Sequence, residues 1–270
     1  MAWAKMKLAI AVAASALLAS GTAALVFATK VWADDAKEIG EIKLDLKASG
    51  ITQVMRQFSA CILDVDSEKP AGIMKLPPDL VAPRFGKLKL GPKESAKRFY
   101  IVWDAPPGKP NRLLIDTNGN GDLTDDEEVK WQLRPNPRVE SYAGQAAFNV
   151  AYGEESAPLT VKFYSMEGKL FYYRDYGRVG QVTLGGKAYQ ALLDDNMTTG
   201  DFRTGPTSSH RGTMLLLDQA GRFDVTRPAF DVERPFKVDG VSYEVTGMTA
   251  SGDSFRIVKS KQDGDNKAQK

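Results

Sequence analysis

One stretch of the chain carries acids, amides and glycines at a spacing that could hold a metal ion: DTNGNGDLTDDE, from Asp116 to Glu127. Calcium is a hard cation that takes about six to eight oxygen ligands, and a loop of about 12 residues wraps it when oxygens recur at alternate positions and end on an acid. The sequence therefore predicts a calcium site. Its ligands would be the side chains of Asp116, Asn118, Asn120 and Thr124, the backbone carbonyl of Asp122, and both carboxylate oxygens of Glu127.

These ligands, with Gly121 at the sharp turn and Leu123 as an apolar anchor, resemble the calcium loop of EF-hand and dockerin proteins. The flanks differ, because NRLLI before the loop is strand-like and EEVKWQLR after it is at best a short helix. The helix-opening mechanism of calcium sensors is therefore excluded. Only Asp116 and Glu127 are charged ligands, so we expect a structural ion with a dissociation constant of about 10⁻⁴–10⁻³ M.

A polar turn is the alternative interpretation, because Asp, Asn and Gly all favour turns. A turn does not need an acid as distant as Glu127, and that residue favours the ion site. Two later segments repeat the arrangement of a strand that ends in aspartate, a polar loop and an apolar anchor. One begins at Asp194 and the other at Asp218.

Loop 194–205 could bind an ion through Asp194, Asn196, Thr198 and Asp201, but no acid occupies its last position, where Gly205 stands. The sequence leaves open whether this loop binds an ion. The third segment, DQAGRFD, lacks side chains for a ligand set and is predicted to be a turn.

Catalytic motifs are sparse. His210 is the only histidine, beside Ser208 and Ser209, and no GxSxG motif, P-loop or dinucleotide fingerprint is present. Cys61 is the only cysteine, lies in an apolar stretch, and is predicted to be a small buried residue. Adjacent acids such as Glu154 and Glu155, or Asp194 and its neighbour, keep open a carboxylate-pair hydrolase as an alternative function.

Residues 1–33 read as an export segment, because Lys5 and Lys7 precede a long uncharged run and Ala33 suits signal-peptidase cleavage. The run is also long enough to span a membrane, so a retained anchor is the alternative to a cleaved signal peptide. Either way, the positive-inside rule places the remainder outside the cytoplasm, in the periplasm or at the cell surface. The membrane is an expected partner only if the segment is kept.

The charge balance does not favour a nucleic-acid partner. The formal net charge of the whole chain is +2, and residues 1–33 carry three lysines and no acids, so the remainder carries −1. No basic stripe with interleaved aromatic residues is present.

The fold class expected from residue 87 onward is all-β, an antiparallel sandwich or barrel, because short runs rich in Val, Tyr, Phe and Thr alternate with glycine-centred turns. Hairpins are predicted at 99–116, 159–177, 181–195 and 236–248. Segment 41–65 is ambiguous between strand and helix, and strands are favoured. The expected organisation is an export segment at 1–33, a linker with first strands at 34–86, an all-β domain at 87–258 with a possible division near 140, and a disordered tail at 259–270.

The region from Pro77 to Trp131 also resembles a segment of exported bacterial proteins of uncharacterised function, some of which continue into a thioredoxin-like redoxin domain. The chain has no CxxC motif, so redox activity does not follow from this resemblance. The sequence thus favours an exported, calcium-stabilised β protein that acts as a binding or cell-envelope module without catalysis. It leaves open whether the partner is a protein or a glycan, and an extracytoplasmic, carbohydrate-active hydrolase is the alternative.

Overall fold

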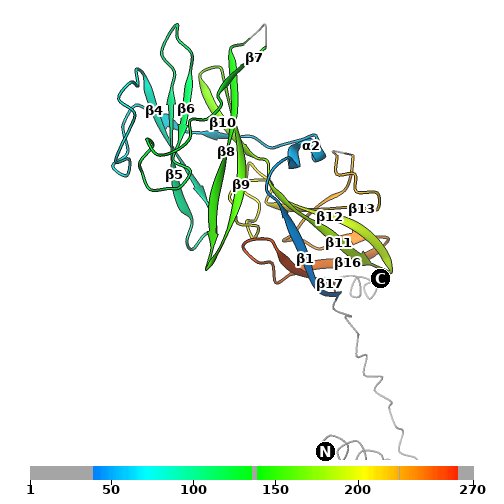
Figure 1. Cartoon of the computed structure of the whole chain (residues 1–270). Helices are drawn as coiled ribbons and strands as arrows, with labels where there is room; N and C mark the ends of the chain where they lie inside the picture. The colour runs from blue at the N-terminus through cyan, green and yellow to red at the C-terminus, as the bar shows by residue number, and fades with distance from the viewer. Residues whose placement is uncertain (1–38, 136–138, 225, 261–270) are drawn as a thin grey trace, which may run out of the picture. The chain divides into compact units, whose positions relative to one another are not determined.

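The computed structural model of the chain describes residues 39–135, 139–224 and 226–260. The predicted export segment at 1–33 and residues 261–270 of the predicted tail lie outside the described residues. Antiparallel strands make up almost all the regular structure of the described part (Figure 1), which confirms the prediction of an all-β protein. Within this part, no helix is long and apolar enough to cross a membrane.

The largest sheet of the described residues is a nearly closed, barrel-like antiparallel sheet of eight strands. Its two edge strands lie close to each other: the ring of Phe230 on one edge strand is 4.8 Å from the ring of Phe236 on the other. The strands, in spatial order, are β14 (Ala229–Asp231), β13 (Thr213–Asp218), β12 (Lys187–Asp195), β11 (Gly177–Leu184), β1 (Ile39–Lys47), β17 (Ser254–Lys259), β16 (Val241–Thr246) and β15 (Phe236–Val238).

Two further sheets pack face to face, with the rings of Phe99 and Phe148 4.9 Å apart between them. One has the order β2 (Cys61–Leu63), β10 (Lys169–Arg174), β9 (Glu155–Met166), β8 (Ser141–Tyr152) and β7 (Gln132–Arg134). The other has the order β3 (Val65–Asp66), β4 (Pro83–Leu90), β5 (Lys97–Asp104) and β6 (Arg112–Ile115). Sandwich and barrel therefore both occur in this chain.

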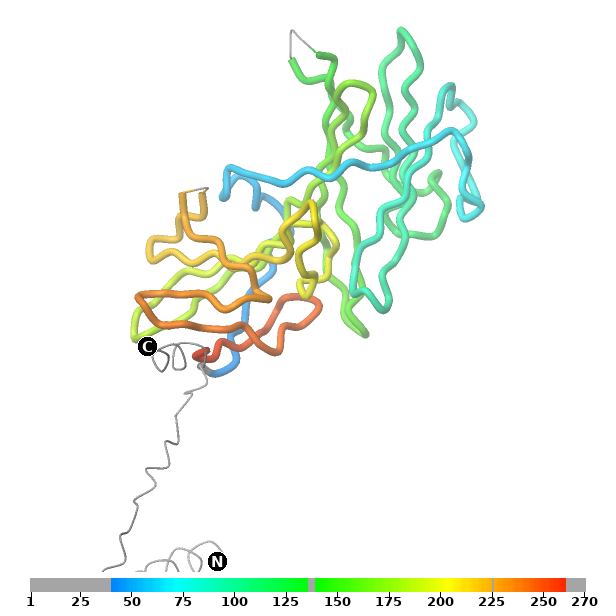
Figure 2. Tube along the Cα trace, turned by 180° about the vertical axis from the view of Figure 1, so that it is seen from behind, coloured from blue at the N-terminus to red at the C-terminus, as the bar shows by residue number. Residues whose placement is uncertain are grey.

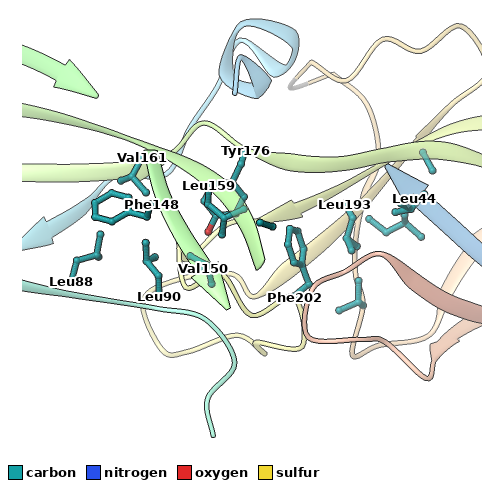
Figure 3. Close-up of a cluster of buried hydrophobic side chains, with 14 of the residues drawn as sticks. Leu44, Leu88, Leu90, Phe148, Val150, Leu159, Val161, Tyr176, Leu193 and Phe202 are labelled. Carbon is teal, nitrogen blue, oxygen red and sulfur yellow. The ribbon is translucent and has the colours of Figure 1, made fainter. Parts of the chain in front are cut away.

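One hydrophobic core runs through the sandwich and into the barrel. Figure 3 shows Phe148 and Leu90 between the sandwich sheets, Tyr176 and Phe202 further along, and Leu193 in the barrel. These side chains are almost completely buried. Burial of apolar area on this scale is the main term that stabilises the fold, at about 25 cal/mol per Å².

The four predicted hairpins are confirmed. β5 pairs with β6, β9 with β10, β11 with β12, and β15 with β16. The turn between β15 and β16 is Asp239-Gly240, and both residues have positive φ. Tight two-residue hairpin turns need positive φ at both central residues, and Asp-Gly is a common sequence there because both residues tolerate it.

The prediction of strands was wrong for part of segment 41–65. The chain forms β1, then the helix α2 (Ile51–Met55), and then β2 and β3. Ile51 and Met55 are the buried face of the helix, as their helical spacing allows. Figure 2 shows the chain continuing from β1 and α2 across to the sheet that contains β4.

Asp175, which follows β10, caps the short helix from a distant part of the chain. Its carboxylate accepts hydrogen bonds from the backbone N–H of Gly50 (2.9 Å) and Thr52 (3.0 Å) and from the Thr52 hydroxyl, and Lys162 Nζ lies 2.9 Å away. Burial acts to raise the pKa of Asp175, but these donors outweigh it and hold the pKa below its usual value.

A carboxyl group with a lowered folded-state pKa stabilises the protein above its unfolded pKa, here about 3.9, and loses this effect as the pH falls. We therefore predict that Asp175→Asn lowers the free energy of unfolding at pH 7 by about 1 kcal/mol or more, as loss of a helix cap does. The difference from the unmutated protein should shrink below about pH 4. Urea unfolding at pH 7 and pH 3 measures it, and a pH-independent difference would contradict the assignment.

Candidate functional site

The predicted calcium loop follows β6, and its first residue is an aspartate without solvent exposure. Asp116 is 0% exposed, and its two carboxylate oxygens accept the backbone N–H of Asn120 (3.0 Å) and of Gly121 (3.1 Å). The oxygens of Asn118 and Asn120 accept the N–H groups two residues ahead, at 2.9 and 2.7 Å. These turns coil the loop around its own polar side chains.

The structure adds Asp125 to the residues that sequence reasoning identified. Its two carboxylate oxygens lie 3.3 Å from the amide nitrogen of Asn118 and 2.8 Å from that of Asn120. Four oxygen-bearing side chains, those of Asp116, Asn118, Asn120 and Asp125, thus gather on one loop. The signal for Asp125 was present in the acidic run TDDEE, but spacing alone favoured a later acid in that run.

The other three predicted ligands lie differently. The predicted ligand of Asp122 is its backbone carbonyl; its side-chain carboxylate forms an ion pair with Lys75 and accepts a hydrogen bond from the hydroxyl of Thr124, which lowers the pKa of Asp122 to about 2. Glu127 is exposed, and no hydrogen bond or ion pair holds its side chain within the described residues. The structure therefore brings Asp116, Asn118 and Asn120 together, and leaves Thr124 and Glu127 at the surface of the loop.

The loop is attached to a neighbouring segment by backbone pairing. The carbonyl of Gly121 accepts the N–H of Met74 at 2.8 Å, and Leu123 N donates to the carbonyl of Lys75 at 3.2 Å. Leu123 is buried in a small apolar cluster with Ile73 and other residues. The apolar anchor expected from the sequence is therefore present, and it joins the loop to segment 73–75.

Three acids of the loop differ from Asp122 in their counter-charge. No Lys or Arg side chain of the described residues forms an ion pair with Asp116, Asp125 or Asp126. One carboxylate oxygen of Asp126 is buried and has no hydrogen-bond partner in the described part of the chain. Burial raises the pKa of Asp126, although Thr117 donates to its other oxygen, and the charges of Asp116 and Asp125 raise it further.

In loop 194–205 a strand again ends in aspartate and is followed by a polar turn, but here a basic side chain pairs with one of the acids. Asp194 pairs with the buried guanidinium of Arg174. Its neighbour Asp195 is fully buried and accepts the Tyr176 hydroxyl at 2.5 Å and the N–H of Gly200 at 2.6 Å. Burial raises the pKa of Asp195, and these two donors partly offset the effect. It is therefore Asp195, rather than the predicted Asp194, that caps this turn.

Other predicted oxygens of this loop are also engaged by protein donors. Asp201 binds the guanidinium of Arg203 at 2.8 Å and the backbone N–H of Lys93 at 2.9 Å. The Thr198 hydroxyl accepts the N–H of Arg174 at 2.9 Å, and Asn196 contacts Ser59 at 2.7 Å. The oxygens that could have formed an ion site are therefore used to hold the loop against neighbouring strands.

The third turn, at Asp218, is the simplest. Its carboxylate accepts the N–H of Ala220 (2.9 Å) and Arg222 (2.8 Å), and Arg227 Nε lies 3.3 Å away. Arginine thus pairs with Asp194 in the second turn and with Asp218 in the third, whereas Asp195 is held by the Tyr176 hydroxyl and a backbone N–H. The first turn has no arginine or lysine paired with its strand-end aspartate in the described residues.

The donor set of the first loop suits a hard cation, because it consists of oxygens. No three His, Cys, Asp or Glu side chains converge on one point in the described part of the chain. An ion at this loop would consequently depend on the amide oxygens of Asn118 and Asn120 and on backbone carbonyls, as well as on Asp116 and Asp125.

The remaining sequence candidates lie apart from one another. His210 is in the loop before β13, where its backbone N–H donates to the Thr207 hydroxyl at 3.1 Å and its carbonyl accepts the Thr207 N–H at 2.8 Å. Glu154 and Glu155 are exposed at the turn between β8 and β9. Cys61 is a partly buried free thiol, and burial raises its pKa.

Comparison of the chain with protein-family models, with curated proteins and with solved structures found no match.

Gly121 provides a test of how closely the loop packs. Its φ is +80°, and a Cβ atom would lie 2.3 Å from the backbone oxygen of Gly72. Gly240 also has φ +80° but has nothing within 4 Å of its Cβ position. Gly240→Ala should therefore cost about 1 kcal/mol of backbone strain, and Gly121→Ala about 3 kcal/mol or more, because backbone must move. Urea unfolding in chelator measures both, and equal losses would contradict the packing.

The Arg174 and Asp194 pair yields a second prediction, because both side chains are at least 95% buried. Asp194→Ala leaves a buried unpaired guanidinium and should cost about 3–5 kcal/mol of unfolding free energy. The double variant Arg174→Met with Asp194→Leu should be more stable than either single variant. Lys187→Ala, which breaks the pair with Asp239 whose side chains are more than half exposed, should have little effect. Additive losses in the double variant would contradict a coupled buried pair.

Proposed function

We propose that loop 116–127 binds one structural calcium ion and that the chain is an exported binding or cell-envelope module. The observation that carries the proposal is the charge of the loop. A fully buried Asp116 and the clustered Asp125 form no ion pair with Lys or Arg in the described residues, whereas Asp194 and Asp218 of the other two turns each pair with an arginine. A buried carboxylate without a counter-charge is costly, and a cation removes that cost.

The proposed ligands are the oxygens of Asp116, Asn118 and Asn120, with Asp125 added and with Thr124, Glu127 and the Asp122 carbonyl kept from the sequence prediction. Calcium would supply a fixed divalent positive charge, and the chain supplies the coiled loop that orients oxygens toward it. Because Gly121 and Leu123 pair with segment 73–75, the ion would stabilise the connection between β6 and that segment.

The export of the chain belongs to the same proposal. Extracellular fluid and the periplasm can hold calcium at concentrations that suit a weak site. The ion stabilises the folded protein only to the extent that free calcium exceeds the dissociation constant of the site. The resemblance of Pro77 to Trp131 to a segment of exported bacterial proteins agrees with export of the chain. It assigns no catalytic activity to the protein.

The calcium proposal predicts a thermal shift. At about 10 mM calcium and a dissociation constant of about 10⁻⁴–10⁻³ M, binding adds about 1.4–2.7 kcal/mol to the free energy of unfolding. For a protein of this size, the midpoint of thermal unfolding should rise by about 3–10 °C relative to chelator. Magnesium at the same concentration should raise it less, because Mg²⁺ demands a smaller octahedral site.

Three variants make the test specific. Asp116→Asn should abolish the calcium-dependent shift, and Asp125→Asn and Glu127→Gln show which acid completes the site. Asp218→Asn is the matched control, because it removes the strand-end aspartate of a turn that has an arginine as its counter-charge. This control should lower stability and keep the full calcium response. No calcium-dependent shift in the unmutated protein would refute the proposal.

A further inference from the structure

A cleft of about 870 Å³ lies beside the calcium loop. Four parts of the chain line it: Gly72, the β4–β5 hairpin from Lys89 to Tyr100, the loop residues 119–121, and residues 199–204 of the second loop. The volume is in the range of sites that hold a small organic ligand or a short oligomer.

The charged side chains that line the cleft are mostly basic. The four cations are Lys89, Lys93, Lys97 and Arg98, and the two carboxylates are Glu94 and Asp201. Both carboxylates already bind Arg203, at 2.7 and 2.8 Å. By contrast, the side chains of Lys89, Lys93 and Arg98 are exposed and have no hydrogen bond or ion pair within the described residues. The cleft therefore presents unneutralised positive charge.

Two of these cations face each other across a pair of strands, an arrangement that does not help the fold. Lys89 on β4 is directly opposite Arg98 on β5. Like charges at directly opposed positions of an antiparallel pair are destabilising. The buried neighbours Leu88 and Phe99 supply the packing of the same strands into the sandwich core. An anionic ligand would relieve the repulsion between the opposed cations.

The hairpin turn that carries Lys93 is held by the second loop. Gly91 N donates to the carbonyl of Thr199 at 2.8 Å, and Lys93 N donates to the carboxylate of Asp201 at 2.9 Å. A Cβ atom on Gly200 would lie 2.9 Å from Gly91 N, so the two backbones are in close contact. The cations thus project from a fixed backbone, which lowers the entropic cost of binding.

We propose that this cleft binds an anionic oligosaccharide through its carboxylate or sulfate groups. The inference rests on the proposed function as a binding module and names its ligand class. Several cations spread along a hairpin match a linear ligand with repeated anionic groups better than a single inorganic ion. A nucleic acid fits less well, because Tyr100 is the one aromatic side chain among the lining residues, and base stacking needs more than one platform.

Isothermal titration calorimetry on the protein in calcium, at about 0.15 M salt, tests the proposal. The probes are a galacturonate hexasaccharide, a heparin-derived hexasaccharide, a neutral glucose hexasaccharide and a single-stranded DNA of matched charge. Binding of either acidic hexasaccharide, without binding of the neutral one, supports the proposal, and the two acidic probes distinguish carboxylate from sulfate. Binding of neither acidic probe, or binding of DNA at equal or higher affinity, overturns it.

Variants separate the cleft from the overall charge of the protein. The double variant Lys89→Gln with Arg98→Gln should weaken binding of the acidic probe about tenfold or more. The control is Lys43→Gln with Lys169→Gln, which removes the same charge from exposed positions on β1 and β10 and should keep the affinity. Equal weakening by both double variants would overturn assignment to the cleft.

The same samples keep the two proposals distinguishable. Thermal unfolding with calcium and with chelator reports the ion site, and calorimetry reports the cleft. A calcium shift without oligosaccharide binding overturns the ligand assignment alone, whereas oligosaccharide binding without a calcium shift overturns the ion site alone.

Discussion

Asp195 lies without solvent exposure at the end of β12, where its carboxylate accepts the hydroxyl of Tyr176 and the N–H of Gly200. Because Gly200 is fixed in this way, the adjoining Thr199 and Asp201 can bind the β4–β5 turn of the sandwich. The hydroxyl of Tyr152 on β8 reaches the carbonyl of the same glycine at 2.6 Å. One buried carboxylate thus orders the loop through which the barrel-like sheet contacts both sheets of the sandwich.

The same device occurs three times, as an aspartate at the end of a strand that accepts backbone N–H groups of the following turn. What differs is the source of positive charge. Arg174 pairs with Asp194, the neighbour of Asp195, and Arg227 pairs with Asp218. Asp116 has its backbone donors and no paired basic side chain in the described residues. We propose calcium as the missing counter-charge of the first turn, whose residues 119–121 also line the basic cleft.

Local signals in the sequence predicted much of this structure. Glycine-centred turns identified the hairpins, because a short turn of positive-φ residues brings adjacent strands into register without help from the rest of the chain. The oxygen spacing identified Asp116, Asn118 and Asn120, whose turns are local as well. By contrast, strand was wrongly favoured where helix α2 forms, because five residues make a weak helical signal and depend on a cap from the distant Asp175.

The features that escaped prediction depend on contacts between distant residues. β1 pairs with β11 and β17, far along the chain, so neither the near closure of the barrel nor its union with a sandwich could be derived from local pattern. The role of Asp125 depends on a fold-back of the loop that alternate spacing does not encode. The basic cleft joins four separate segments of the chain. Its positive charge could not be seen in an overall composition that is nearly neutral.

The measurement that most directly tests the calcium site is anomalous diffraction from crystals grown in calcium and collected at a long wavelength. We predict one anomalous peak enclosed by the oxygens of Asp116, Asn118, Asn120 and Asp125, with oxygen distances of about 2.3–2.6 Å. A well-ordered loop with water or a lysine ammonium at that position, in the presence of calcium, would contradict the proposal.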